Sequence, residues 1–428
     1  MQINDIRKAG AAPAGGWLQR PVFDTRALEE TVSGILTEIR TGGDAAVRKY
    51  ALLYDKSAPA APECSAAEIM TGAAAVDEQL KAAIRVAAAN ISAFHLAQRR
   101  SEESVETMPG VRCWRKMVAI EKVGLYIPGG TAPLFSTLLM LAIPARIAGC
   151  REIVLCSPPD SQGQLHPAIL YAAELVGVTR IFRIGGVQAI GAMAYGTQSV
   201  PAVYKIFGPG NQYVTCAKQL VLREGVAIDM PAGPSEVAVY ADETADAGFV
   251  AADLLSQAEH GVDSQVLLVS PSAVLVEAVL AAVEEQVKTL PRAGIARMAL
   301  EHSRAFIVRD AVQAMELLNA YAPEHLILSS EDAGALAELV TNAGSVFLGH
   351  YSPESAGDYA SGTNHVLPTN GHARAYSGVS LDSFVKKITF QQLTREGLLG
   401  IGDTVSRMAE AEGLEAHARA VRMRMDKK

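Results

Sequence analysis

The feature that most constrains the fold of this chain is a rhythm that repeats three times between residues 126 and 234. Each repeat is a short apolar run that ends in glycine or proline and leads into a stretch with helical spacing of its apolar residues. Short strands alternating with helices form βαβ units, whose strands lie in one parallel sheet. Residues 126–234 are therefore predicted to form one doubly wound domain with strands at 152–157, 178–184 and 203–207.

A second set of strand-like runs begins after residue 234, and residues 245–260 have the spacing of a helix between the first two runs. A chain of 428 residues is too long for one ordinary core, so more than one domain is expected. The sequence thus predicts an α/β protein with a second parallel sheet, whose strands cover residues 237–240, 265–269, 305–308, 325–328 and 345–348.

The same patterns suggest where the domains begin and end. Residues 25–125 contain mainly helical stretches and are assigned, with residues 235–380, to a larger α/β domain into which residues 126–234 are inserted. Residues 1–24 are expected to form a helical N-terminal arm. Residues 381–428 are expected to form a helical tail whose weak apolar stripes suit packing on a partner subunit.

Charge and apolar patterning disfavour two classes of partner. The net charge is −8 and no Lys/Arg-rich tract is present, which argues against nucleic acid. The apolar run 138–143 is stopped by Pro144, and the run 273–283 contains Glu277, so neither reaches the roughly 18 residues that span a membrane. The N-terminus has no secretory pattern, and the five cysteines show no paired spacing. A cytoplasmic protein with reduced thiols is expected.

Two glycine loops follow strands of residues 126–234 and lead into predicted helices. They are Gly185-Gly186 and Gly208-Pro209-Gly210. Backbone amides at a helix N-terminus suit phosphate, and ligands of parallel sheets bind beyond the carboxyl ends of the strands. However, the segment has no G-x-G-x-x-G fingerprint, and glycines there also serve ordinary turns. A nucleotide site and plain turn geometry both remain open on these residues alone.

A candidate metal site begins with Gln257 and His260. Residues three apart on a helix share a face, so both side chains can reach one ion, and histidine is a common zinc ligand. The alternative is a helix end in which a late histidine complements the dipole before Gly261. Asp358 stands in the Gly/Ser-rich segment 354–365, where a lone aspartate more often forms a turn.

Glu324 and His325 form the candidate acid–base pair. They directly precede the apolar run 326–328 and therefore stand at the mouth of a predicted strand. A histidine of ordinary pKa suits removal of an alcohol proton, and a carboxylate can activate water. A solvated polar pair at a strand start is an equally good interpretation of these two residues by themselves.

Six blocks of the sequence resemble the histidinol dehydrogenase family. They include FGPGNQYVTCAK, DMPAGPSEV and GDYASGTNHVLP, and the resemblance extends from about residue 30 to the C-terminus. It implies two incomplete Rossmann-like domains with a helical tail, in a domain-swapped homodimer. The six blocks cover residues 123–144, 207–218, 229–237, 255–265, 321–326 and 357–368.

The resemblance also implies the site residues. One zinc ion per subunit would be held by Gln257, His260, Asp358 and, from the partner chain, His417. Glu324 and His325 would be the catalytic acid–base pair. NAD would contact Tyr126, Gln188 and Asn211. The substrate would be bound by Ser235, Gln257, His260, His325, Asp358, Glu412 and His417.

The implied reaction is a four-electron oxidation of L-histidinol to L-histidine through bound L-histidinaldehyde, with two NAD consumed. Zinc would position the substrate, His325 would act as the base and Glu324 would activate water. Three alternatives are weighed against it. They are a related zinc and NAD enzyme for another small polar alcohol, a zinc hydrolase that uses Glu324, and a thiol-dependent aldehyde dehydrogenase that uses Cys113 or Cys150.

Overall fold

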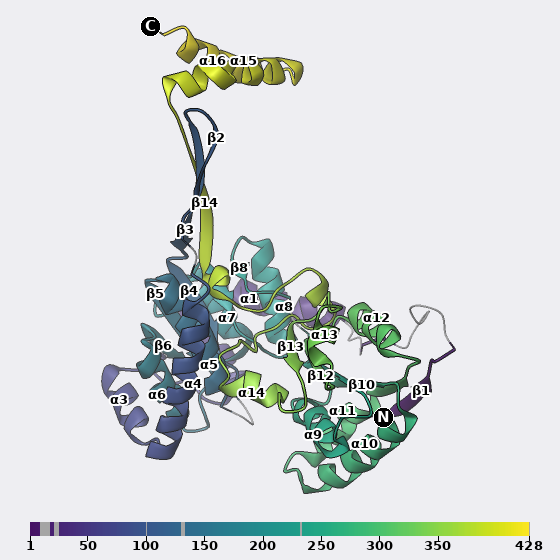
Figure 1. Cartoon of the computed structure of the whole chain (residues 1–428). Coiled ribbons are helices and arrows are strands. Elements are labelled where there is room, and N and C mark those ends of the chain that lie inside the picture. Colours follow the sequence, from purple (N-terminus) through teal and green to yellow (C-terminus); the bar gives the residue numbers. More distant parts are fainter. Residues whose placement is uncertain (9–17, 21–24, 100, 130–132, 232, 428) are drawn as a thin grey trace.

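Two α/β bodies and one projecting arm make up the molecule (Figure 1). The structure is a computed structural model that describes residues 1–8, 18–20, 25–99, 101–129, 133–231 and 233–427. Within these residues, no helix combines the length and apolar character that crossing a membrane requires.

The first body is built on a five-stranded parallel sheet with strand order β6-β5-β4-β7-β8. The α/β class with parallel sheets that the sequence predicts is thereby confirmed, and strands lie at each of the three predicted positions. The chain starts at the centre with β4, builds outward on one side, and then crosses to the other side, as in doubly wound sheets. The strands are β4 (Lys122–Tyr126), β5 (Glu152–Ser157), β6 (Arg180–Arg183), β7 (Lys205–Phe207) and β8 (Ala227–Ile228).

Alternate residues of these strands face two separate helical layers. Val123 and Leu155 belong to one buried apolar cluster, whereas Val154 and Tyr126 belong to the other. The first layer contains α3 (Ala66–Ala74), α4 (Glu78–Leu96), α5 (Phe135–Ala148) and α6 (Pro167–Val176). The second contains α1 (Thr25–Gly42), α2 (Asp44–Tyr50), α7 (Gly186–Tyr195) and α8 (Gln212–Arg223).

The opening helices therefore lie on a different sheet from the one assigned to them above. The sequence pattern groups residues 25–125 with residues 235–380, but α1 packs on α7 and α8, and α4 packs on α5. Helix α1 lies there because its apolar stripe is buried on that side. Val32 and Ile39 of the stripe are fully buried in the apolar cluster that α7 and α8 form with the five-stranded sheet. The stripe indicates a buried face but does not specify which of two sheets covers it.

The second body has a six-stranded parallel sheet with order β1-β11-β10-β9-β12-β13. Five of its strands follow one another in the same spatial order as those of the first sheet, starting at the centre and crossing to the other side after the third strand. They are β9 (Glu236–Ala241), β10 (Gln265–Ser270), β11 (Arg304–Ile307), β12 (His325–Ser329) and β13 (Ser345–Leu348). The helices are α9 (Ala247–Ala258), α10 (Ala273–Gln286), α11 (Ala293–Glu301), α12 (Ala311–Tyr321), α13 (Ala333–Ala337) and α14 (Glu354–Tyr359).

The expected helical arm at residues 1–24 is wrong for its first residues. Gln2–Asp5 form strand β1, which pairs in parallel with β11 at the edge of the six-stranded sheet. The adjacent Ile6 is only 2% exposed, so burial against this sheet outweighs any local helical preference. Residues 9–17 and 21–24 of the expected arm lie outside the described residues.

The arm is an antiparallel sheet with a pair of helices at its far end (Figure 1). Strand β14 (Val385–Leu393) pairs along its full length with β3 (Val111–Ala119), which also pairs with β2 (Ser104–Met108). The helical C-terminal region is confirmed by α15 (Arg395–Ala411) and α16 (Glu415–Met425). Residues 385–393 of the expected helical tail are instead a strand, because β3, which is distant in the sequence, pairs with them. The remaining short helices are η1 (Ala51–Asp55), η2 (Val287–Thr289), η3 (His372–Arg374) and η4 (Leu381–Phe384).

Candidate active site

The candidate acid–base residues lie at the amino end of the six-stranded sheet. His325 is the first residue of β12, Glu324 directly precedes it, and Glu236 is the first residue of the neighbouring strand β9. The register pairs His325 with Val237, which places Glu324 beside Glu236. Gln257 is brought to the same edge by the last turn of α9. The candidate residues of this sheet therefore lie at the end opposite to the carboxyl edge, where ligands of parallel sheets usually bind.

The main chain of Glu236 orients the side chains around it. Its N–H donates to Oε2 of Glu324 at 2.9 Å, and its carbonyl oxygen lies 3.2 Å from Nδ1 of His325. Nε2 of Gln257, a donor, also lies 3.3 Å from Nδ1, but its two hydrogens are directed to the Glu236 carbonyl oxygen and to Glu324. A carbonyl oxygen can only accept, so we assign the hydrogen to Nδ1, which leaves Nε2 to take a proton when the ring is neutral. The sequence pair Glu324-His325 is therefore a buried, oriented pair and not a solvated one, since these residues are 6% and 3% exposed.

Gln257 is oriented by the same carbonyl group. Its Nε2 donates to the Glu236 carbonyl oxygen and to Oε2 of Glu324, each at 3.3 Å. The amide oxygen Oε1 is buried and has no hydrogen-bond partner among the described residues. A buried acceptor that lacks a donor is costly unless a ligand or ion supplies the missing interaction.

Helix α14 contributes two carboxylates to the same cluster. Oδ1 of Asp358 lies 3.3 Å from Nε2 of His325, and Glu354 lies one helical turn before Asp358. One ligand atom from each of His325, Glu354 and Asp358 lies within 4.8 Å of the others, so these three could hold a metal ion. In the described part of the chain, the buried acceptors Glu354 Oε2 and Asp358 Oδ1 also lack a hydrogen-bond donor. The donor set of carboxylate, amide oxygen and imidazole fits a divalent cation such as zinc.

The charges of this cluster are strongly coupled. Burial acts to lower the pKa of His325, but the carboxylates of Glu354, Glu324 and Asp358 outweigh it and raise that pKa well above its usual value. Burial raises the pKa of Glu354 to about 8. Burial also acts to raise the pKa of Asp358, but the imidazole of His325, 3.3 Å away, lowers it below the ordinary range.

His260 joins this cluster to a cleft of about 810 Å³. The imidazole is open to the cleft, whose walls nevertheless desolvate it and lower its pKa, while the carboxylate of Asp358 acts in the opposite direction. His260 and Asp358 are therefore within electrostatic reach of each other. The cleft is lined from both bodies, by residues that include Arg20, Asn211, Ser235, His260 and Asn370.

The three expected NAD contacts lie at the carboxyl edge of the five-stranded sheet. Tyr126 ends β4, and its hydroxyl oxygen accepts from the N–H of Gly186 at 3.0 Å. Gln188 follows in α7 and donates from Nε2 to Oδ2 of Asp55 at 2.9 Å. Asn211 caps α8 by accepting from two backbone N–H groups, and it faces the cleft. The structure thus brings Tyr126 and Gln188 together, with Asn211 on the neighbouring loop.

Glu412 and His417 are not part of the cluster within one chain. Glu412 caps the end of α15 and His417 lies in α16, and both residues are exposed. These helices stand at the far end of the arm, away from both sheets (Figure 1).

Sequence reasoning missed four residues that the structure connects to the site. Glu354 could have been found, because it stands four residues before Asp358 on one helix face. Asp55, Glu236 and Arg20 carried no such signal, since their partners are distant in the chain.

Buried acid–base residues, unpaired ligand atoms and a cleft between two parallel-sheet bodies define an α/β enzyme with a possible metal centre. The family model described as histidinol dehydrogenase matches residues 18–425. A histidinol dehydrogenase of Bacteroides fragilis is 60% identical over 409 residues, covering 96% of each chain. One of Xylella fastidiosa (strain Temecula1 / ATCC 700964) is 53% identical over 428 residues, covering 99% of each chain.

A solved structure agrees with these relatives. The crystal structure of histidinol dehydrogenase from Elizabethkingia anophelis superposes with a TM-score of 0.96 at 51% identity, covering 99% of this chain and 98% of that one. The chain belongs to the histidinol dehydrogenase family, whose members are oxidoreductases of histidine biosynthesis. The predicted family, the predicted enzyme class and the predicted place in histidine biosynthesis are therefore confirmed.

Proposed function

We propose that this enzyme oxidises L-histidinol to L-histidine in two successive hydride transfers to NAD, with L-histidinaldehyde retained between them. The observation that carries the proposal is the set of unpaired ligand atoms of Gln257 and Asp358, next to the oriented pair Glu324 and His325. Four electrons are removed in total, and one water supplies the second carboxyl oxygen of the product.

Gln257, His260 and Asp358 would hold one zinc ion together with the partner subunit's His417. The buried Oε1 of Gln257 and Oδ1 of Asp358 support this set, because neither accepts a hydrogen bond from the described residues. Bound zinc would position the imidazole and amine of histidinol and would offset the surrounding carboxylate charge, so that His325 can be neutral.

His325 acts as the base in both oxidations. The carbonyl oxygen of Glu236 keeps the hydrogen on Nδ1, so Nε2 accepts the hydroxyl proton while the hydride leaves the same carbon. Glu324 acts between the two transfers by taking a proton from the water that adds to the aldehyde. His325 returns its first proton to the aldehyde oxygen, which completes the hydrate. The hydrate then loses its hydride, and its hydroxyl proton goes again to His325. Ser235 and Glu412 would complete the contacts to the substrate.

Tyr126, Gln188 and Asn211 would bind NAD on the first body, and the 810 Å³ cleft would let its nicotinamide face the substrate of the second. The assignment is supported by Gln188 itself, because Asp55 holds its Nε2 and its buried Oε1 accepts no hydrogen bond from the described residues. We place the enzyme in the cytoplasm, where the five cysteines, unpaired in the described chain, would stay reduced.

The enzyme would be a homodimer in which the arm of one chain reaches the cleft of the other. Two observations support this arrangement. Glu412 and His417 are exposed at the end of an arm that cannot fold back within its own chain without losing the pairing of β14 with β3. The arm also exposes large apolar side chains that a partner could cover, including Ile388, Phe390, Leu399, Met408 and Leu414.

The thiol-dependent alternative is disfavoured by the cysteines themselves. Burial raises the pKa of Cys150 to about 12, which disfavours the thiolate that a nucleophile requires. Cys113 lies in β3, in the antiparallel sheet of the arm and not in the cleft.

The yield of NADH per histidinol consumed tests the proposal against the remaining alternatives. A yield of two is expected from purified, zinc-loaded protein, whereas a hydrolase gives none and a simple alcohol dehydrogenase gives one. The variant Glu324→Gln should retain the first transfer and slow the second by roughly 10²-fold or more, so that the yield approaches one. If that variant slowed alcohol and aldehyde oxidation equally, the role given to Glu324 would be wrong.

A further inference from the structure

One residue, Glu236, connects the side chains of the proposed mechanism. Its N–H bonds to Glu324, and its carbonyl oxygen bonds to both Gln257 and His325. The main chain of Glu236 thus decides which ring nitrogen of His325 can take a proton and which amide atom of Gln257 faces the metal site. A shift of its main chain would disturb three functional side chains at once.

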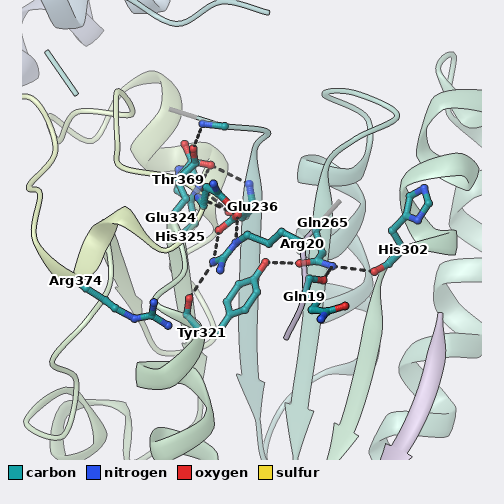
Figure 2. Close-up of polar contacts among 12 residues, drawn as sticks. Gln19, Arg20, Glu236, Gln265, His302, Tyr321, Glu324, His325, Thr369 and Arg374 are labelled. Atoms are coloured by element: carbon teal, nitrogen blue, oxygen red, sulfur yellow. Dashed lines mark hydrogen bonds and ion pairs between the residues drawn. The ribbon is translucent and has the colours of Figure 1, made fainter. Parts of the chain in front are cut away.

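The side chain of Glu236 is fixed by a buried ion pair with Arg20. The carboxylate is 1% exposed and pairs with the guanidinium in a two-point arrangement, Nε with Oε1 and Nη2 with Oε2 at 2.9 Å. The backbone N–H of Asn370 donates to Oε1 at 3.0 Å. Figure 2 shows Arg20 reaching from the side of Gln19 to Glu236, directly beside Glu324 and His325.

The guanidinium of Arg20 is also held by Tyr321. Its Nη2 donates to the carbonyl oxygen of Tyr321 at 2.9 Å, and its guanidinium lies 3.9 Å from the centre of the Tyr321 ring. The Tyr321 hydroxyl in turn donates to Oε1 of Gln265, at the start of β10, at 2.8 Å. The guanidinium therefore ties together the starts of β9 and β10, the end of α12 and the loop at Asn370.

We propose that Arg20 is a positioning residue that, through Glu236, aligns Gln257 for zinc and His325 for proton transfer. The proposal rests on the proposed function, although its metal arm can be tested without any substrate. A buried ion pair contributes little net stability compared with apolar packing, so a role in fixing a unique geometry explains its burial better. Arginine suits the role because its planar fork matches a carboxylate at two points.

The test compares Arg20→Met with Arg20→Lys by two measurements. Zinc affinity, from competition with a chelator in the absence of histidinol, should fall about 10- to 100-fold in Arg20→Met. At saturating zinc, kcat should also fall by about 10- to 100-fold, because His325 loses its alignment. Arg20→Lys should recover part of both losses.

Arg180→Met is the matched control. Arg180 also forms a two-point pair with a glutamate, Nε and Nη2 with Glu63 at 2.8 and 2.7 Å, but on the edge strand β6 of the first body. This variant should lower thermal stability and leave zinc affinity unchanged. The proposal would be overturned if Arg20→Met behaved like this control. In that case its thermal stability would fall, while its zinc affinity and its kcat at saturating zinc would equal those of the wild type.

The double variant Arg20→Met/Glu236→Gln covers the case in which the single variant does not fold. It removes the buried unpaired charge, so stability should recover, while zinc affinity and kcat should stay low. Recovery of both to wild-type values would also overturn the proposal. If wild-type protein gave no NADH from histidinol, the proposed function would fail, and the zinc measurements would still decide the role of Arg20.

Discussion

Two buried histidines, His325 and His95, carry the same side chain in opposite electrostatic settings. Three carboxylates surround His325 and raise its pKa despite burial. His95 is fully buried in α4, where Nδ1 bonds only to the carbonyl oxygen of Ile91 at 2.9 Å and desolvation lowers the pKa. At the scale of single residues, the neighbours therefore decide whether burial favours or opposes the charge.

His95 should make the protein sensitive to acid. The unfolded imidazole takes up a proton near pH 6.5, whereas the folded one does so only at lower pH. The unfolded state thus binds more protons as the pH falls through this window, and stability falls with it. Urea unfolding of wild type and His95→Leu at pH 8, 6.5 and 5 should show the variant gaining stability relative to wild type as the pH decreases. A constant stability difference between His95→Leu and wild type over this pH range would contradict the assignment.

At the scale of single elements, the glycine loop between β7 and α8 has a structural role that does not depend on a ligand. Gly208 follows β7 with φ +126°, and a Cβ there would lie 2.0 Å from the carbonyl oxygen of Tyr126. The loop must therefore pass directly over the end of β4 to start α8. The sequence shows two glycines in this turn, but only the neighbouring strand explains why one of them is obligatory. In the same way, the partner β3 makes residues 385–393 a strand.

The variant Gly208→Ala should lose stability for two reasons, the strain of its positive φ and a steric contact of the new Cβ. The left-handed φ alone costs about 1–3 kcal/mol, and the contact with the Tyr126 main chain should add about 1–3 kcal/mol. Gly225→Ala is the matched control, because Gly225 has φ +99° but open space around its Cα. The free energy of unfolding from denaturant titration should fall in both variants, and further in Gly208→Ala. Equal losses would show that the close approach to Tyr126 has no energetic consequence.

The whole molecule determines whether the site is complete. Gln257 and Asp358 both contact His325 on one body, and His260 lies within electrostatic reach of Asp358, whereas His417 lies in α16 at the end of the arm. A single chain therefore contains two halves of the proposed zinc site that do not meet. A dimer in which each arm reaches the other body would complete both sites and cover the apolar side chains of the arm.

Mixed dimers test this shared site. His260→Asn and His417→Asn should each be inactive and poor in zinc, but after unfolding and joint refolding, mixed dimers regain one intact site. About one quarter of wild-type activity should return, since half of the dimers are mixed and half of their sites are intact. A mixture of His260→Asn with Gln257→Ala is the control, because both changes lie on the body and no intact site can form. No rescue in the first mixture would argue against ligands shared between chains.

The local pattern of the sequence determined the alternation of strands and helices, because apolar spacing reports directly which residues an element buries. It also marked Glu324 and His325, which stand next to each other at a strand start. Their chemistry stayed open, because nothing local distinguishes a buried pair from a solvated one. The sequence resemblance brought in Asp358, which spacing alone would have left as a turn residue.

Only the tertiary structure decided which sheet the helices of residues 25–98 cover, that Gln2–Asp5 are an edge strand, and that Arg20 reaches Glu236. The physical reason is the same in each case. These choices depend on backbone hydrogen bonds, ion pairs and apolar contacts between segments that lie far apart in the chain. A side chain's own sequence neighbourhood contains no record of the partner that will pack against it.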